Sequence, residues 1–167
     1  MGDVHIFEKP GAGAHLTQVA IFKQIWLYSN KKSYITDVFL REYMNTELWL
    51  NCFAHVLAKG MNQYPYFKYY AKNIALLAPG EHSLLDHGTE EARINYSLDI
   101  EERTKGKSTA NWQKLYDLRD ELKVEYKKHF PTTKGMMIGY KYDPEEQIKI
   151  VGKLNKKFFE ELAEKKK

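Results

Sequence analysis

The sequence predicts an α+β protein in which a small core of short strands lies between N-terminal and C-terminal α-helices. Three observations favour this class. Apolar residues recur at steps of three and four in segments near both ends of the chain, as on one face of a helix. Short apolar runs in the middle of the chain have the length and composition of buried strands. The length of 167 residues suits one domain, or a small core wrapped in helices.

The N-terminal part is predicted to be a flexible lead followed by one helix. Residues 1–14 show no periodicity and end in a run of Pro, Gly and Ala. A helix is predicted over residues 15–28, because Leu, Val, Phe and Trp recur there at helical spacing. Short strand-like pieces are predicted next, at residues 33–35 and 38–40.

The middle of the chain predicts a strand, a long loop, a second strand and a helix. The run at 48–57 is rich in Leu, Trp, Phe and Val, which suits a buried strand. Residues 60–72 are rich in Tyr and Lys, and Pro65 disfavours a helix there. A short apolar strand at 74–77 is followed by a helix predicted from Pro79 to about residue 87.

Three further helices are predicted in the C-terminal part, over residues 90–103, 112–129 and from Asp143 onward. Residues 130–135 form the clearest linker. The predicted organisation is therefore a lead at 1–14, a domain of short strands with flanking helices at 15–130, and a linker with the C-terminal helix at 131–167.

Charge and cysteine content limit the class of protein. The chain has 26 Lys+Arg against 22 Asp+Glu, a net charge of +4, which permits a polyanionic partner without requiring one. Cys52 is the only cysteine, so an intrachain disulfide and a four-cysteine zinc site are excluded. No apolar run approaches the roughly 20 residues of a membrane span, and acidic residues occupy the N-terminus where a signal peptide would be basic. We expect an intracellular, cytoplasmic protein.

One constellation has the residue types that phosphodiester hydrolysis requires. His55 falls on the first predicted strand, Asn73 just before the second, and His82 and Asp86 on the following helix. The ordinary pKa of histidine, about 6.5, suits a general base near neutral pH. An asparagine on the neighbouring loop is a group that can orient such a base. His82 and Asp86 are four residues apart on a helix, so they share a face and can chelate one divalent ion.

These segments resemble the HNH endonucleases found in many phage and bacterial genomes. The resemblance is carried by Phe53-Ala54-His55-Val56-Leu57-Ala58-Lys59-Gly60, Tyr64-Pro65-Tyr66-Phe67, Lys72-Asn73-Ile74-Ala75-Leu76-Leu77 and Glu81-His82. It implies a small ββα-metal core and a metal-dependent hydrolase that cuts DNA. His55 would then be the general base, Asn73 the residue that steadies it, and His82 a metal ligand. A phage-encoded protein would act in the host cytoplasm.

The chain departs from this family at one position that affects metal binding. Relatives often carry Asp, Glu or a second His directly before the base, whereas this chain has Ala54. The alternatives are weak metal binding, ligation by Asp86 or His87, or an inactive protein that keeps the fold and binds nucleic acid or serves a structural role. The ion is left open among magnesium, manganese, zinc and nickel.

Lys59, Lys68 and Lys72 are candidates for DNA contacts, because they alternate with tyrosines close to the predicted site. The alternative for them is a solvated basic loop, and Lys156 and Lys157 are given no role beyond solvated charge. A third possibility for the whole chain is a helical interaction protein in which the motif is a coincidence.

Overall fold

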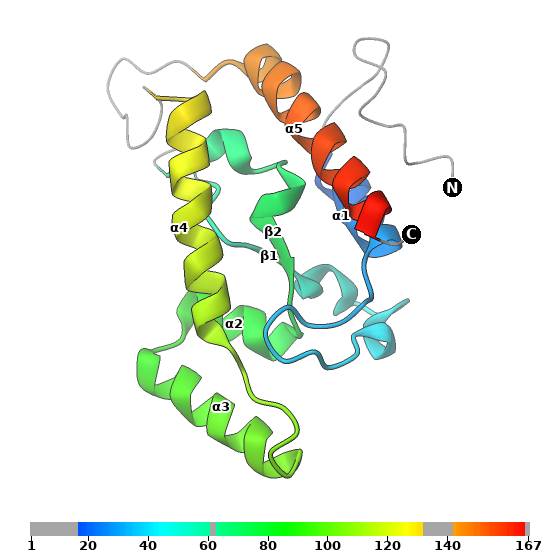
Figure 1. Ribbon diagram of the computed structural model, residues 1–167, viewed down its shortest axis with the longest axis vertical. Coiled ribbons are helices and arrows are strands. Elements are labelled where there is room, and N and C mark those ends of the chain that lie inside the picture. Colours follow the sequence, from blue (N-terminus) through cyan, green and yellow to red (C-terminus); the bar gives the residue numbers. More distant parts are fainter. Residues whose placement is uncertain (1–16, 61–62, 132–141, 166–167) are drawn as a thin grey trace. The chain divides into compact units, whose positions relative to one another are not determined.

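The computed structural model describes residues 17–60, 63–131 and 142–165. It is rich in helix and contains a two-stranded antiparallel sheet, so the predicted α+β class is confirmed (Figure 1). The elements in chain order are α1 (Gln18–Tyr28), the 3₁₀ turns η2 (Arg41–Tyr43) and η3 (Trp49–Cys52), β1 (Phe53–His55), the 3₁₀ turns η4 (Pro65–Phe67) and η5 (Ala71–Asn73), β2 (Ile74–Leu76), α2 (Pro79–His87), α3 (Glu90–Arg103), α4 (Trp112–His129) and α5 (Pro144–Lys165).

The chain divides into two compact units, each assembled from separate segments. The first unit comprises Met1–Ser29, Leu57–Ile74 and Glu121–Lys167, and the second comprises Asn30–Val56 and Ala75–Asp120. The predicted lead at 1–14 and most of the predicted linker lie outside the described residues. The predicted domain boundaries therefore stay predictions.

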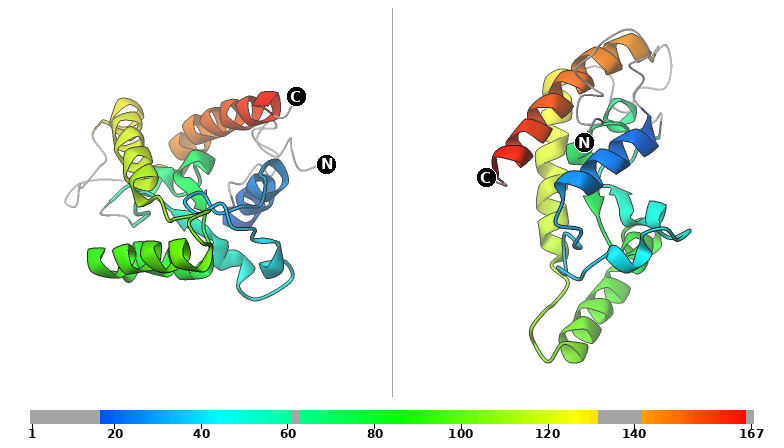
Figure 2. Two further views of the ribbon diagram at one scale, coloured as in Figure 1. Left: turned by 60° about the horizontal axis from the view of Figure 1, so that its bottom comes forward. Right: turned by 90° about the vertical axis from the view of Figure 1, so that its right-hand side faces the viewer.

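In the first unit, α1 packs against α5. The helix begins where Thr17 accepts a hydrogen bond from the backbone N–H of Ala20 at 3.2 Å, which caps its first turn. The rings of Tyr28 and Phe159 lie 5.5 Å apart between the two helices, which run side by side in both views of Figure 2. The helix predicted at 15–28 is thus present from Gln18.

Aromatic side chains form the core of the first unit. The loop between the strands contributes buried Tyr64, Tyr66 and Phe67, which meet α4 and the residue that follows it. Tyr66 stacks on Phe130 with ring centroids 4.3 Å apart, and Phe67 meets Tyr126 edge to face at 4.8 Å. Tyr64, Tyr66 and Tyr70 of this loop are therefore core residues, whereas Tyr69 is half-buried.

The same loop has little regular structure, so its buried backbone groups need partners from elsewhere. Two buried carboxamides of α5 supply them. Asn155 accepts from the N–H of Ala71 at 2.7 Å and donates to the carbonyl of Tyr69 at 2.9 Å. Gln147 donates to the carbonyls of Pro65 and Tyr66 at 3.2 and 3.3 Å. The C-terminal helix therefore fixes the loop through polar side chains as well as through apolar packing.

In the second unit, the strands are shorter than predicted. The N-terminal half of the predicted strand at 48–57 is the turn η3, and only Phe53–His55 forms β1, because its partner β2 is itself only Ile74–Leu76. The pieces predicted at 33–35 and 38–40 are reduced to one bridge between Lys32 and Phe39. Asp37 closes that turn at φ 60°, a conformation that Asp tolerates better than most residues.

The first turn of α2 is held by Glu81, whose carboxylate is fully buried in the second unit. It accepts hydrogen bonds from the hydroxyls of Ser33, Thr36 and Tyr96 at 2.6, 2.8 and 2.7 Å. The backbone N–H of Ala78 donates a fourth, at 2.9 Å. A buried carboxylate is stable only when its lone pairs are satisfied, so these four donors and Glu81 depend on one another.

The remaining helices of the second unit are joined by side-chain bonds to carbonyls. The Arg93 guanidinium of α3 donates to the carbonyls of Leu84 and Gly88, which are exposed where α2 ends. The Trp112 indole, at the start of α4, donates to the carbonyl of Arg93 at 3.1 Å. Of the helices that the structure describes, none is long and apolar enough to cross a membrane.

We predict that Glu81→Ala lowers the free energy of unfolding by about 3 kcal/mol, because it leaves several buried donors without a partner. Urea denaturation followed by circular dichroism measures this. Glu101→Ala, which removes an exposed glutamate of α3, is the control and should change stability by less than about 0.5 kcal/mol. Equal effects of the two substitutions would contradict the role given to Glu81.

Candidate functional site

His55 is the last residue of β1 and is half-buried. The sheet is closed beside it by the N–H of Leu77, which donates to the carbonyl of Cys52 at 2.8 Å. A histidine at this place is carried on regular, hydrogen-bonded backbone. The preceding Ala54 is fully buried, and its methyl side chain has no atom that could bind a metal.

His82, in the first half of α2, has both ring nitrogens engaged within the second unit. Nδ1 lies 2.7 Å from the carbonyl oxygen of Asn51 in η3, and Nε2 lies 3.0 Å from Oδ2 of Asp86. Because a carbonyl oxygen can only accept, Nδ1 carries the proton in this arrangement. Nε2 faces the Asp86 carboxylate, either as a lone pair or with a proton of its own.

Two electron-pair donors 3.0 Å apart require a positive charge between them. A proton on Nε2 supplies it and gives an ion pair, and a divalent cation bound by both atoms supplies it as well. The separation fits both cases, since an N–H···O hydrogen bond spans about 2.7–3.2 Å, and two neighbouring ligands of an octahedral ion with bonds of about 2.1 Å lie about 3.0 Å apart. Metal-binding histidines commonly donate their other N–H to a backbone carbonyl, as His82 does to Asn51.

His87 lies on a different face of α2. Five residues turn a helix by about 500°, which places His87 roughly 140° around the axis from His82. The two alternatives for a second ligand, Asp86 and His87, are therefore distinguished by geometry, and only Asp86 meets His82. Across the described ranges, no three His, Cys, Asp or Glu side chains are grouped closely enough to hold a metal ion.

Asn73, in the first unit, is fully buried, and its carboxamide bonds to backbone atoms. Its oxygen accepts from the N–H of Leu57 at 2.7 Å, and its nitrogen donates to the carbonyls of Leu57 and Phe67 at 3.2 and 3.1 Å. Leu57 is two residues beyond His55, so Asn73 fixes the chain that leaves β1. Its predicted influence on His55 would then act through the backbone.

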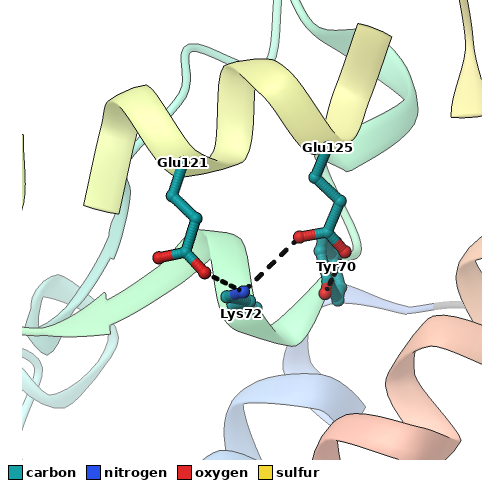
Figure 3. A network of polar contacts seen from close by, with 4 residues as sticks. All are labelled: Tyr70, Lys72, Glu121 and Glu125. Carbon is teal, nitrogen blue, oxygen red and sulfur yellow. Dashed lines mark hydrogen bonds and ion pairs between the residues drawn. The ribbon is translucent and has the colours of Figure 1, made fainter. Parts of the chain in front are cut away.

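The three lysines predicted to contact DNA have different surroundings in the first unit. Lys59 is exposed and donates to Gln18 at 3.3 Å, while Lys68 lies over the ring of Tyr69 at 5.2 Å. Lys72 is held by two carboxylates of α4, Glu121 at 2.7 Å and Glu125 at 3.5 Å (Figure 3). The two carboxylates neutralise the Lys72 ammonium, which favours a structural role for this residue.

The pKa shifts of Lys72 and Tyr70 agree with their contacts to Glu121 and Glu125. Partial burial lowers the pKa of Lys72, but the hydrogen bonds and charges of Glu121 and Glu125 outweigh it, so the pKa is raised overall. Tyr70 donates to Glu125 at 2.7 Å, and burial together with this bond raises the pKa of its hydroxyl. Figure 3 shows Tyr70 and Lys72 converging on the same glutamate from one short segment.

Cys52 lies directly before β1 and is buried. Burial, with a smaller contribution from the charge of Glu81, raises the pKa of its thiol to about 11. A thiol that stays protonated at neutral pH is a poor nucleophile and a poor metal ligand. This cysteine is therefore a core residue and not part of a reactive site.

Sequence reasoning missed two residues that shape the site. The carbonyl of Asn51 sets the tautomer of His82. Every residue has a backbone carbonyl, so the residue type at position 51 does not reveal this contact. In the sequence, Glu81 stands out only as the neighbour of His82 in the segments that resemble HNH endonucleases, whereas its partners lie in distant segments. The only sign of these partners in the sequence is the pair of hydroxyl residues Ser33 and Thr36. Their role as donors to Glu81 becomes apparent only when the fold is known.

Comparisons with protein-family models, with curated proteins and with solved structures found no match for this chain. The function is therefore inferred from the geometry of the site.

We predict that Lys72→Met lowers the free energy of unfolding by roughly 0.5–1 kcal/mol, because it removes a partly exposed ion pair but keeps the apolar stem. Affinity for a DNA duplex should change by less than about twofold. Fluorescence anisotropy at several salt concentrations tests this. If Lys72 contacts a phosphate, the slope of log affinity against log salt becomes shallower by about 0.9 instead.

We predict that Cys52 reacts with a disulfide reagent at pH 8 much more slowly in the folded protein than in urea. The folded pKa of about 11 is above the ordinary value of 9.0 for a cysteine thiol, so folding favours the neutral thiol. Its contribution to stability is complete below pH 9 and is lost as the pH rises through about 11. Rapid reaction of the folded protein would contradict this assignment.

Proposed function

We propose that this protein is a metal-dependent endonuclease of the HNH type that hydrolyses phosphodiester bonds of DNA. The observation that carries the proposal is the arrangement of His82, whose Nδ1 is fixed by a backbone carbonyl while Nε2 and a carboxylate oxygen stand 3.0 Å apart. The order of β1, a long loop, β2 and α2 agrees with a ββα-metal core, and His55 ends the first strand.

His82 and Asp86 are the residues that would hold the ion. Two protein ligands suit an ion that completes its shell with water and substrate phosphate oxygens, as magnesium and manganese do. When bound, the ion stabilises negative charge on the scissile phosphate and on the leaving oxygen. Asp86 would supply the carboxylate that Ala54 cannot supply.

His55 is the general base of the proposed reaction. Its imidazole takes a proton from water as the water oxygen forms a bond to phosphorus, and the bond from phosphorus to the leaving oxygen breaks. The leaving oxygen gains a proton from solvent. Asn73 keeps the chain after β1 in place through Leu57, and Lys59 and Lys68 stay candidates for phosphate contacts.

A second candidate is a protein that binds DNA without cutting it. Ala54 and the lack of three grouped ligands in the described part of the chain favour this reading. In that case a proton, and not a metal ion, joins His82 to Asp86 as an ordinary helix ion pair.

We predict that the wild type nicks supercoiled plasmid in Mg²⁺ or Mn²⁺ and that His55→Ala and Asp86→Asn each reduce the rate at least 100-fold. Loss of a general base typically removes a factor of about 10²–10⁴, and loss of a ligand weakens ion binding. Gel assays across a panel of divalent ions measure this. His87→Asn should retain most activity, since His87 lies on another face of α2.

His129→Ala, a histidine substitution at the end of α4, is the control for general effects of histidine loss. DNA binding without nicking in every divalent ion would reject the enzyme and favour the second candidate. Equal losses in Asp86→Asn and His87→Asn would reject the geometry given for the ion.

A further inference from the structure

Helix α3 of the second unit presents two large aliphatic side chains to solvent. Ile94 and Leu98 are 53% and 58% exposed, and they lie about one helical turn apart on the same side of the helix. The outer side of a helix that packs on a protein normally carries polar residues. Single exposed apolar residues are ordinary, but a neighbouring pair on one helix face is a candidate contact surface.

Exposed glutamates lie beyond this pair at both ends of the helix. They are Glu90 and Glu91 in the first turn and Glu101 and Glu102 in the last. With 100° per residue, all four lie within about 60° of the line midway between Ile94 and Leu98. Glu91, Ile94, Leu98 and Glu101 follow one another at steps of three, four and three residues, which is the spacing of a seam between two packed helices. We refer to the four glutamates and the aliphatic pair as the α3 acidic seam.

The arginines of α3 point away from the acidic seam. Arg93 donates to the carbonyls of Leu84 and Gly88, at the end of α2. Arg103 lies roughly 180° around the helix from Ile94, and it pairs with Asp99 at 2.9 Å. Neither arginine neutralises the glutamates of the seam.

Lysines are present near one end of the seam only. Lys105 and Lys107 are exposed in the turn that ends the helix, where Lys105 has a φ of 54° and so leaves the helical path. In the part of the chain that the structure describes, no ammonium or guanidinium group pairs with a glutamate of the seam. At the other end, the sequence has no Lys or Arg between Lys72 and Arg93. The acidic charge is therefore largely uncompensated.

Helix stability does not account for the acidic residues of the last turn. The C-terminal end of a helix carries partial negative charge, so Glu101 and Glu102 oppose the helix dipole. Glutamates in the first turn, in contrast, are favourable. A cationic partner lying along the seam would stabilise both ends.

The opposite side of α3 is fixed to the rest of the second unit. Tyr96 donates to Glu81 at 2.7 Å, the Trp112 indole donates to the carbonyl of Arg93 at 3.1 Å, and Ile100 is buried at 6% exposure. The seam is therefore presented on a helix that is already ordered, which lowers the entropic cost of binding.

We infer that the α3 acidic seam binds a basic amphipathic helix of a partner protein. The partner helix carries two apolar side chains about one turn apart, which pack on Ile94 and Leu98, and a Lys or Arg one turn beyond each of them, which faces the glutamates. DNA and anionic membranes carry the same sign of charge as the seam and are disfavoured. The inference does not depend on the proposed function, because it uses neither His55 nor His82 and Asp86.

A second copy of the same helix is a poor partner. An antiparallel pairing that sets Ile94 against Leu98 of the second copy also sets Glu90 against Glu102 and Glu91 against Glu101. Like charges placed opposite one another destabilise such a pairing. The charge pattern therefore favours a basic helix from a different protein.

The test is an NMR titration of the ¹⁵N-labelled protein with an alanine-based peptide of about 20 residues, a length that supports a helix in water. The peptide carries the pattern Lys-x₂-Leu-x₃-Leu-x₂-Lys, and a control peptide has Glu in place of both lysines. We expect the amide signals of α3 to shift with a Kd on the order of 100 μM for the basic peptide. The acidic control peptide should bind at least tenfold more weakly, and about 0.5 M salt should weaken the basic peptide.

Matched variants identify the surface that binds. Ile94→Gln with Leu98→Gln should weaken binding at least fivefold, and Gln at all four seam glutamates at least threefold at low salt. The apolar control is Val19→Gln with Val124→Gln, which changes two exposed valines of α1 and α4. The charge control places Gln at four exposed glutamates of α5, which are Glu145, Glu146, Glu160 and Glu161. Both controls should stay within about twofold of the wild type, and circular dichroism confirms that each variant is folded.

Several results would overturn the inference. No shift of α3 signals at 2 mM basic peptide would show that the seam does not bind such a helix. Equal binding of the acidic peptide, or equal weakening by the control variants, would remove the role given to the seam. Concentration-dependent α3 signals without peptide, abolished by Ile94→Gln with Leu98→Gln, would assign the seam to a second copy of the chain instead.

Discussion

The second unit depends on one buried carboxylate, that of Glu81. It joins the turn at Ser33 and Thr36, the start of α2 and Tyr96 of α3 through hydrogen bonds of 2.6 to 2.9 Å. These four partners are three hydroxyls and one backbone N–H. Because His82 follows Glu81 directly, the same bonds fix where its imidazole meets η3.

In the first unit, a loop with little regular structure is buried, and its backbone groups need hydrogen-bond partners. Asn73, Gln147 and Asn155 satisfy the backbone of that loop with carboxamides, and aromatic rings fill the space around it. A carboxamide both donates and accepts, so one side chain can replace a missing strand partner. Asn73 in particular fixes Leu57, two residues beyond His55.

The helices could be predicted from the sequence, because their apolar periodicity and their caps are local features of the chain. It predicted the pairing of His82 with Asp86 from helical spacing, and the structure brings these two together. It overestimated the strand at 48–57, since η3 competes for the same apolar residues. The partners of Glu81 and the engagement of Lys72 by α4 could not be predicted, because both depend on segments distant in sequence.

The proposed function requires that His82 and Asp86 share a divalent ion. The most direct measurement is the broadening of histidine ring signals in NMR spectra as Mn²⁺ is added in substoichiometric amounts, without DNA. We expect the signals of His82 to broaden first, with those of His129 unaffected, and Asp86→Asn to abolish the effect. Sharp His82 signals at Mn²⁺ concentrations that broaden other residues would contradict the account.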